Sequence, residues 1–224
     1  MSTARENILA RLRAAETQAP TFDAEPQPPP EWGMREKRLR FIERMEAVRA
    51  EVIETSADDL ATVLASWLAS REVRSLLHDP GSRWAEMLHQ AIADGAELPE
   101  LIAFNREIEL WKRSLFDNVD AALTTTLGGI AETGSLMLWP SADEPRSMSL
   151  VPPIHIAVLE EKQLYATFAE ALEQQQWAEA MPSNALLISG PSKSADIERT
   201  LAYGVHGPKE LLVLLLRDED EEAS

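Results

Sequence analysis

The sequence predicts an α/β protein with an open, largely parallel sheet, helices on both faces of the sheet, and an N-terminal helical extension. Apolar runs of strand length alternate with amphipathic helical patterns along the 224 residues, which is typical of sheets covered by helices. Two runs, 153–160 (PIHIAVLE) and 210–216 (ELLVLLL), are nearly continuous in apolar residues. Strands that are buried on both faces of a parallel sheet have this pattern.

Residues 1–50 are expected to form N-terminal helices joined by a proline-rich linker. Thr3 and Glu6 form a capping-box pattern ahead of an apolar stripe, which predicts a short amphipathic helix. Residues 17–31 hold five prolines, and such density favours extended backbone. We interpret this segment as a loose linker, with a strap across a partner surface as the alternative. A second helix is expected over 32–50.

Residues 51–217 are expected to form the α/β domain. Strands are predicted at 51–55, 73–77, 121–127, 135–139, 153–160, 185–189 and 210–216, with the last two both buried. Helices are predicted after the capping pair Ser56 and Asp59, from Ser82 to about Gly95, around Ile108 and Trp111, and at 128–132, 164–175 and 194–204. Residues 218–224 (DEDEEAS) are expected to be a disordered acidic tail.

Composition argues against several classes of function. The net charge of −17, from 21 basic and 38 acidic residues, disfavours binding to nucleic acid and to anionic membranes. The chain has no cysteine, which excludes disulfides, a thiol nucleophile and a conventional cysteine-ligated cluster within it. The four histidines are scattered, so we expect no metal site.

No apolar run approaches the ~20 residues that a membrane span requires. The first residues also lack the continuous apolar stretch of a signal peptide. We therefore expect a cytoplasmic protein without membrane insertion.

The common phosphate-binding, dinucleotide-binding and hydrolase motifs are missing, and three polar loops remain as candidates. The first is 131–135 (AETGS). Gly134 allows close approach of a ligand, Thr133 and Ser135 offer hydroxyls, and Glu132 offers a carboxylate as base or nucleophile. The alternative, which these residues alone favour, is a polar turn between two strands.

The second loop is 146–156 (RSMSLVPPIHI). Arg146 is able to hold a carboxylate or phosphate with a forked pair of hydrogen bonds. His155 falls inside a predicted strand, where a histidine is more often a packed core residue than a catalyst.

The third loop, GPSKSADIE followed by GVHGP, lies between two predicted strands. The helix predicted from residue 194 would begin at the carboxyl end of a strand, where backbone N–H groups attract anions and open α/β sheets bind ligands. Lys193 is unfavourable beside the positive end of a helix dipole, so it is interpreted as a partner of a bound anion or, equally, of Glu198. The candidate ligand-binding residues are Gly190, Ser192, Lys193 and Gly207, and the candidate acids, bases or nucleophiles are Asp196, Glu198 and His206. For His206 the equal alternative is a residue that only caps or braces the turn.

Several segments resemble the lactate utilization protein C family, the proteins with a LUD domain. They are ARENILARLRAA (4–15), AETGSLML (131–138), SLVPPIHIAVL (149–159) and GPSKSADIERTLAYGVHGPKEL (190–211). Together they extend over nearly the whole chain in the order of the family, and the last is long and specific. Residues 115–130 depart from the commoner family pattern ahead of the AETGS loop. The resemblance implies a fold similar to the sugar-phosphate isomerase and CoA-transferase superfamily.

The resemblance also implies a three-subunit system that oxidises L-lactate to pyruvate, with a cysteine-rich-domain subunit and an iron–sulfur subunit as partners. Iron–sulfur clusters are then expected on the partners and no cofactor in this chain, in agreement with the missing cysteines. No catalytic residue set transfers with the family.

Two functions from different classes follow. The first is a non-redox subunit of an acceptor-linked L-lactate dehydrogenase complex, which supports assembly or binds a substrate or cofactor. The second is a stand-alone enzyme or binding protein for a small phosphorylated or CoA-linked metabolite. A pure scaffold or regulatory role is a third option.

Overall fold

The computed structural model describes residues 4–14, 30–105, 113, 115–195, 201–204 and 206–217. The described chain forms a six-stranded main sheet, a four-stranded small sheet and a two-stranded hairpin. All neighbouring strands of the main sheet are parallel, in the order β1-β12-β7-β4-β2-β3. The predicted open α/β sheet is therefore confirmed.

The strands and helices have the following bounds. The main sheet consists of β1 (Glu51–Thr55), β12 (Glu210–Leu216), β7 (Ile154–Glu160), β4 (Ala121–Thr125), β2 (Ser75–His78) and β3 (Glu100–Ala103). The small sheet consists of β8 (Leu164–Tyr165), β5 (Gly128–Ile130), β6 (Ser135–Leu138) and β9 (Leu186–Ile188), and the hairpin of β10 (Lys193–Ala195) and β11 (Leu201–Tyr203). The helices are α1 (Ala4–Ala14), α2 (Met34–Ala47), α3 (Leu60–Ala69), α4 (Arg83–Ala93), α6 (Arg146–Leu150), α7 (Phe168–Gln174) and the 3-10 turn Glu161–Gln163.

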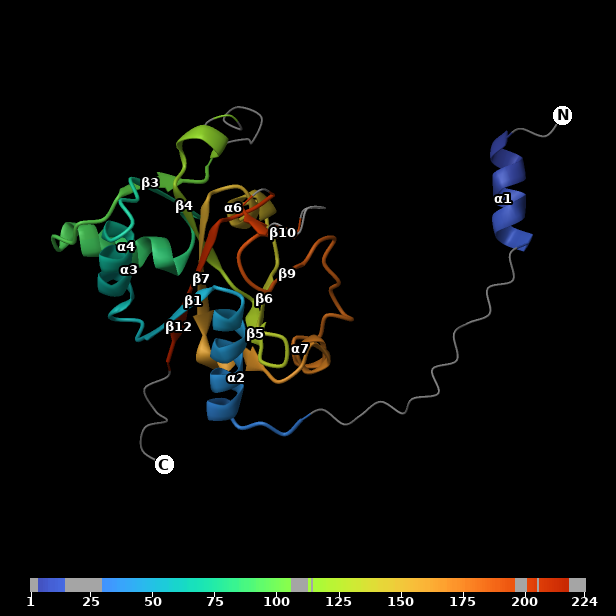
Figure 1. The fold of residues 1–224 in the computed structure, drawn as a ribbon, viewed down its shortest axis with the longest axis horizontal. Coiled ribbons are helices and arrows are strands. Elements are labelled where there is room, and N and C mark those ends of the chain that lie inside the picture. The colour runs from blue at the N-terminus through green and yellow to red at the C-terminus, as the bar shows by residue number, and fades with distance from the viewer. Residues whose placement is uncertain are drawn as a thin grey trace.

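The two faces of the main sheet are covered by different layers (Figure 1). Alternate residues of β7 and β12 point to opposite faces. Ile156 and Leu214 pack with α3 and α4 on one face. Ala157 and Val213 pack with α2 and the small sheet on the other. The expectation of helices on both faces is confirmed, although a second sheet shares one face with α2 and α6.

Helix α2 is joined to the main sheet by apolar packing and by a buried ion pair. Phe41 and Met45 are fully buried against the sheets. One turn earlier, Arg38 Nη1 lies 2.5 Å from a carboxylate oxygen of Glu161, which directly follows β7. The helix expected over 32–50 is present and contributes to the core, while the division of the chain at residue 50 stays a prediction.

Local start and stop signals are confirmed in the first half of the domain. The Ser56 hydroxyl accepts a hydrogen bond from the Asp59 backbone N–H at 3.1 Å, in the turn before α3. Ser82 caps α4 by accepting from the backbone N–H of Ala85 at 3.2 Å. Gly95 has a φ of 97° directly after this helix, a conformation that glycine adopts without strain. Strand β3 was not predicted.

The helix predicted at 128–132 is wrong, because residues 128–130 form β5 in the middle of the small sheet. A Cβ atom on Gly129 would lie 2.9 Å from side-chain atoms of Leu159 and Leu164. Glycine is thus needed here for the close approach of the two sheets. The helix predicted at 164–175 begins only at Phe168, where Thr167 caps α7, because Leu164–Tyr165 pair with β5.

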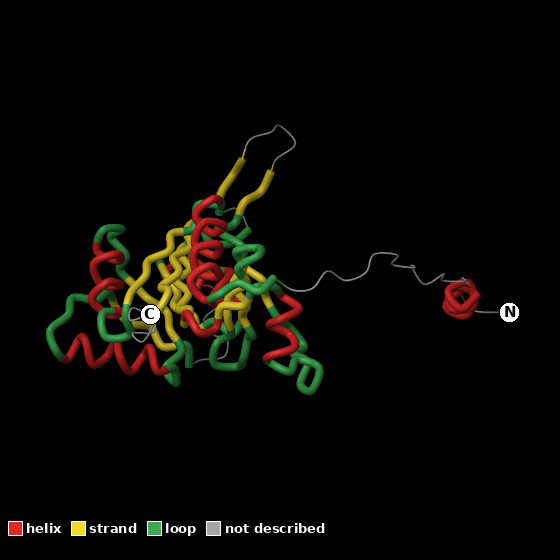
Figure 2. Tube along the Cα trace, turned by 90° about the horizontal axis from the view of Figure 1, so that it is seen from below, coloured by secondary structure: helices red, strands yellow, loops and turns green. Residues whose placement is uncertain are grey.

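The helix predicted at 194–204 is also wrong at its described residues. Lys193–Ala195 and Leu201–Tyr203 pair as antiparallel strands, and Figure 2 shows this hairpin projecting from the body of the molecule. The base of the hairpin is held by the backbone of Ser192, which is bonded to two residues of the returning segment. Its N–H donates to Pro208 O at 2.8 Å, and its carbonyl accepts from Gly204 N at 3.0 Å.

Some predictions concern residues outside the described ranges. They include most of the linker at 17–31, the helix around Ile108 and Trp111, and the tail at 218–224. The predicted N-terminal helix is present as α1, and it buries none of its residues. Among the described helices, none combines the length and apolar character needed to cross a bilayer.

Candidate functional site

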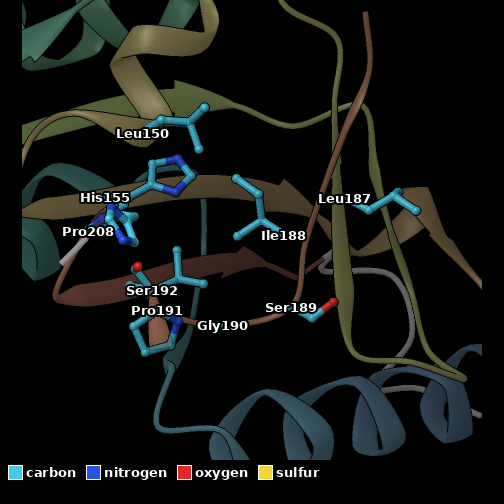
Figure 3. A pocket seen from close by; sticks show the side chains of 13 residues that line it. Leu150, His155, Leu187, Ile188, Ser189, Gly190, Pro191, Ser192 and Pro208 are labelled. Atoms are coloured by element: carbon cyan, nitrogen blue, oxygen red, sulfur yellow. The ribbon is translucent and has the colours of Figure 1, made fainter. Parts of the chain in front are cut away.

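A cavity of about 250 Å³ lies between the main sheet, β9 and the loops at the base of the hairpin (Figure 3). Its walls come from the end of α6, the starts of β7 and β12, strand β9 with its following loop, and the loop before β12. The lining residues are Ser149, Leu150, His155, Leu187, Ile188, Ser189, Gly190, Pro191, Ser192, His206, Gly207, Pro208 and Leu211.

The cavity lies near the amino ends of β7 and β12 of the main sheet, whereas the GPSKS loop was expected at the carboxyl end of a strand. The GPSKS loop does follow a strand, but that strand is β9 of the small sheet. The small sheet places this loop beside His155, the second residue of β7, and Leu211, the second residue of β12.

His155 is the buried polar group of this cavity, with 1% of its surface exposed. Figure 3 shows its imidazole between the side chains of Leu150 and Ile188. Nε2 lies 2.8 Å from the Thr124 hydroxyl, whereas buried Nδ1 has no hydrogen-bond partner among the described residues. Burial lowers the pKa of His155 to about 3, so the ring is neutral at pH 7. A neutral imidazole offers one donor and one acceptor, so one of these two functions, at buried Nδ1, is unused within the described part of the chain.

The loops at the base of the hairpin bring four predicted residues to the cavity, namely Gly190, Ser192, His206 and Gly207. Gly190 has a φ of 121°, and a Cβ atom there would lie 2.7 Å from Val48 Cγ2. Only glycine fits this turn without strain. His206 is exposed, so it lies where a ligand would enter rather than in the buried part.

A chain of three hydroxyls connects the AETGS turn to the cavity wall. Thr133 Oγ1 lies 2.8 Å from Ser135 Oγ, and Ser135 Oγ lies 2.6 Å from Ser189 Oγ. Ser135 is buried, and Ser189 lines the cavity. Ser135 therefore belongs to the layer behind the wall. Thr133 is exposed at the far end of the chain.

Gly134 and Glu132 serve the turn itself in this structure. A Cβ atom on Gly134 would overlap Arg44 Cβ, so this glycine allows the turn to pack against α2. The Glu132 backbone N–H donates to Ala166 O at 3.0 Å, and its side chain is exposed. Neither residue lines the cavity.

Other predicted site residues are not brought to the cavity. Lys193 is exposed on β10 and is absent from the cavity wall. Arg146 lines a second, smaller cavity described below. Asp196 and Glu198 lie outside the described residues. The roles assigned to all these residues stay predictions.

The smaller cavity, of about 10 Å³, lies beside the first, and the two share Ser149. Thr124, Glu144 and Arg146 are among its other lining residues. The Glu144 carboxylate accepts a hydrogen bond from the backbone N–H of Thr125. Burial, with the nearby Asp79 as a lesser cause, raises the pKa of Glu144 to about 7.

Sequence reasoning missed the roles of His155, Ser149, Ser189, Thr124 and Glu144. His155 was judged a core residue, and it is one, but its ring also borders the cavity. The available signal was a polar residue in each of two neighbouring apolar strands, His155 in β7 and Thr124 in β4. Within the described part of the chain, no three His, Asp or Glu side chains are grouped as a metal site requires.

Comparison with known proteins gives consistent results. Residues 39–216 match the LUD domain family. An uncharacterized protein of Neisseria meningitidis is 38% identical over 220 residues, covering 96% of this chain and 94% of the relative. The lactate utilization protein C of Oceanobacillus iheyensis is 27% identical and covers 89% of each chain. The lactate utilization protein C of Geobacillus thermodenitrificans is also 27% identical, and the match covers 95% of this chain and 94% of the relative.

A solved structure supports the fold. The crystal structure of a DUF162 family protein from Deinococcus radiodurans superposes with a TM-score of 0.59 at 25% identity, covering 83% of this chain and 99% of the other. The family match extends from α2 to the last residue of β12 and includes every residue of the cavity. The chain belongs to the LUD domain family.

Proposed function

We propose that this protein acts in lactate utilization, as a non-redox subunit of an iron–sulfur system that oxidises L-lactate, and that the cavity binds a small hydroxy acid. One observation carries the proposal. A neutral, buried histidine with a free ring nitrogen borders a cavity in a chain that is similar to lactate utilization protein C over most of its length.

The chemistry of the cavity suits a small 2-hydroxy acid. Such a molecule has one hydroxyl, which both donates and accepts, and a carboxylate, which only accepts. His155 Nδ1 can pair with either group, depending on its tautomer. Ser149 and Ser192 place further hydroxyls in the wall. The volume of about 250 Å³ accommodates a three-carbon acid with some water, since one water occupies about 30 Å³ of the liquid.

The absence of cysteine defines the division of labour in this proposal. The chain has no thiolate for a cluster, so electron transfer is assigned to a cysteine-rich-domain subunit and an iron–sulfur subunit. This chain's own residues bind and orient the small molecule and shield it from water. The apolar part of the wall, which includes Leu150, Ile188 and Leu211, serves the shielding.

The test uses the full chain, tagged and purified from its native host grown on L-lactate. Wild-type protein is expected to co-purify with cluster-bearing subunits and to reduce a dye when L-lactate is added. His155→Gln should keep the subunits but lose most of the dye reduction. His89→Gln, which changes an exposed histidine outside the cavity, is the matched control and should retain it. Full-rate oxidation by the partner subunits without this chain would overturn the proposal.

A stand-alone role on a phosphorylated or CoA-linked metabolite has less support. Its main argument was an anion-binding helix N-terminus at the GPSKS loop, and residues 193–195 form a strand instead. Calorimetric binding of phosphate or CoA to the wild-type chain, with no response to L-lactate, would favour this alternative over the proposal.

A further inference from the structure

The wall of the cavity beside His155 offers few charged groups to a ligand. None of the 13 described residues that line it is a lysine, arginine, aspartate or glutamate, and its two ionisable side chains are His155 and His206. The ring of His155 is neutral at pH 7, because burial lowers its pKa. The buried end of the cavity therefore presents no cation to a carboxylate, and a buried charge without a partner is costly.

The two histidines lie at different depths. His155 is 1% exposed and belongs to β7, whereas His206 is exposed in the loop before β12. A carboxylate beside His206 keeps part of its hydration and accepts a hydrogen bond from a ring N–H. A carboxylate beside His155 would lose its water without gaining a cation. The mouth of the cavity is thus the less costly place for the charged end of a ligand.

Ser149 gives the buried end a hydrogen-bond acceptor. It belongs to α6, which packs against β4 and β7, the strands that carry the Thr124–His155 pair. Ser149 is 2% exposed, and its hydroxyl hydrogen is already used in a bond to Arg146 O at 3.1 Å. Towards a ligand, Ser149 Oγ can then only accept. Carboxylate and ketone oxygens also only accept, so neither can pair with it.

A ligand hydroxyl fits both polar atoms at the buried end. It can donate its hydrogen to Ser149 Oγ and accept from Nδ1–H of His155, an atom without a partner among the described residues. With the hydrogen on Nδ1, Nε2 of the same ring accepts from the Thr124 hydroxyl. A ketone oxygen can also accept from Nδ1–H, but it has no hydrogen to donate to Ser149.

We propose that the cavity selects a 2-hydroxy acid over the corresponding 2-oxo acid, with the ligand hydroxyl bound by Ser149 and His155 at the buried end and its carboxylate beside His206 at the mouth. The proposal rests on the proposed function and deepens it, since it names the group of the ligand that the buried end recognises. In a system that oxidises lactate, this preference favours binding of the substrate and release of the oxidised product.

The test compares three acids on the full wild-type chain at pH 7. L-Lactate, pyruvate and propionate share a three-carbon chain with a carboxylate and differ at the second carbon. Dissociation constants are read from NMR signals of nitrogen-15-labelled histidine rings. We expect L-lactate to bind about five- to tenfold more tightly than pyruvate and propionate, the scale of one hydrogen bond, with the ring of His155 neutral and protonated on Nδ1 in the complex.

The outcomes separate this inference from the proposed function. Pyruvate that binds as tightly as L-lactate, or more tightly, would overturn the inference and leave the binding of a small acid intact. A doubly protonated His155 ring in the L-lactate complex would also overturn it, because the carboxylate would then lie at the buried end. If none of the three acids binds, both proposals are wrong.

Variants test the two ends of the ligand separately. Ser149→Ala should weaken L-lactate and leave pyruvate nearly unchanged, so that the ratio of their dissociation constants approaches one. Ser147→Ala, in the same helix but absent from the walls of both cavities, is the matched control and should keep the wild-type ratio. His206→Gln should weaken both acids by a similar factor. A ratio that survives Ser149→Ala would contradict the proposal, and the wild-type comparison decides if this variant does not fold.

Discussion

Strands β12 and β9 have similar apolar sequences, but they occupy different environments. The residues 211–216 of β12 are all buried, between β1 and β7 in the main sheet. Strand β9 is the edge of the small sheet, and its Leu187 is 50% exposed. The prediction that both strands are buried is correct for β12 and wrong for β9. The comparison indicates that the main sheet provides stability, while the edge of the small sheet forms the wall of a site.

The largest expected effect comes from breaking the ion pair that fixes α2, the helix shared by both sheets. In Arg38→Ala, Glu161, which is 2% exposed, keeps its buried charge without its closest partner. We expect a loss of about 3–5 kcal/mol in the free energy of unfolding, measured by urea denaturation. Arg40→Ala removes an exposed pair on the same helix and should cost less than about 1 kcal/mol. Equal losses in the two variants would show that the Arg38 pair has no special role.

A matched pair of leucine truncations tests the comparison directly. Leu214→Ala in β12 opens a hole in a fully buried position and should cost about 2–5 kcal/mol. Leu187→Ala in β9 removes a half-exposed side chain and should cost less than about 1 kcal/mol. Both values come from urea denaturation at one pH. A larger loss of unfolding free energy for Leu187→Ala than for Leu214→Ala would contradict the claim that the main sheet provides most of the stability.

The turn after β9 should respond to a smaller change. Gly190→Ala places a Cβ atom 2.7 Å from Val48 Cγ2 at a φ of 121°, so we expect a loss of about 1–3 kcal/mol and a displaced cavity wall. Gly81→Ala, whose Cβ atom would meet only Asp79 at 3.4 Å, is the control and should change stability little. The melting temperatures of the two variants are compared by thermal denaturation. Identical melting temperatures would show that Gly190→Ala introduces no backbone strain.

The smallest expected effect is a pH dependence that arises at Glu144. Burial raises the pKa of Glu144 from 4.5 to about 7, so between these values the folded state binds a proton that the unfolded state has lost. The stability associated with this group is therefore present below pH 4.5 and is lost as pH rises through about 7. Glu144→Gln has no carboxyl that titrates here, so it does not show this loss. The difference in free energy of unfolding between the variant and wild type should therefore be about 1–2 kcal/mol more favourable to the variant at pH 8 than at pH 5. A gain that is the same at both pH values would contradict this account.

Most strands of the main sheet, all except β3, could be predicted from the sequence because they have strong, local signals. The apolar runs of β7 and β12, the capping serines Ser56 and Ser82, and the stop at Gly95 each act within a few residues. Of the small sheet, strands β6 and β9 were predicted, but β5, β8 and the separation into a second sheet were not, since these depend on long-range contacts. Gly128–Ile130 form a strand by pairing with β6 and β8, and no local pattern shows this.

The candidate site was predicted only in part, for the same reason. Gly190, Ser192, His206 and Gly207 do lie at the cavity, but in loops at the base of a hairpin rather than at the start of a helix. The polar centre of the cavity depends on the meeting of Thr124 and His155, which are 31 positions apart in the sequence. A side chain judged alone, as His155 was, has no partner from which its role can be inferred.

The central claim is that the cavity beside His155 binds a small hydroxy acid, and a ligand titration tests it most directly. Histidine ring signals of the nitrogen-15-labelled chain are recorded by NMR while L-lactate is added at constant pH. We expect saturable shifts for His155 and His206, which line the cavity, and no shift for His78 and His89, which do not. Unchanged signals of His155 at saturating L-lactate, or equal shifts of all four histidines, would contradict the claim.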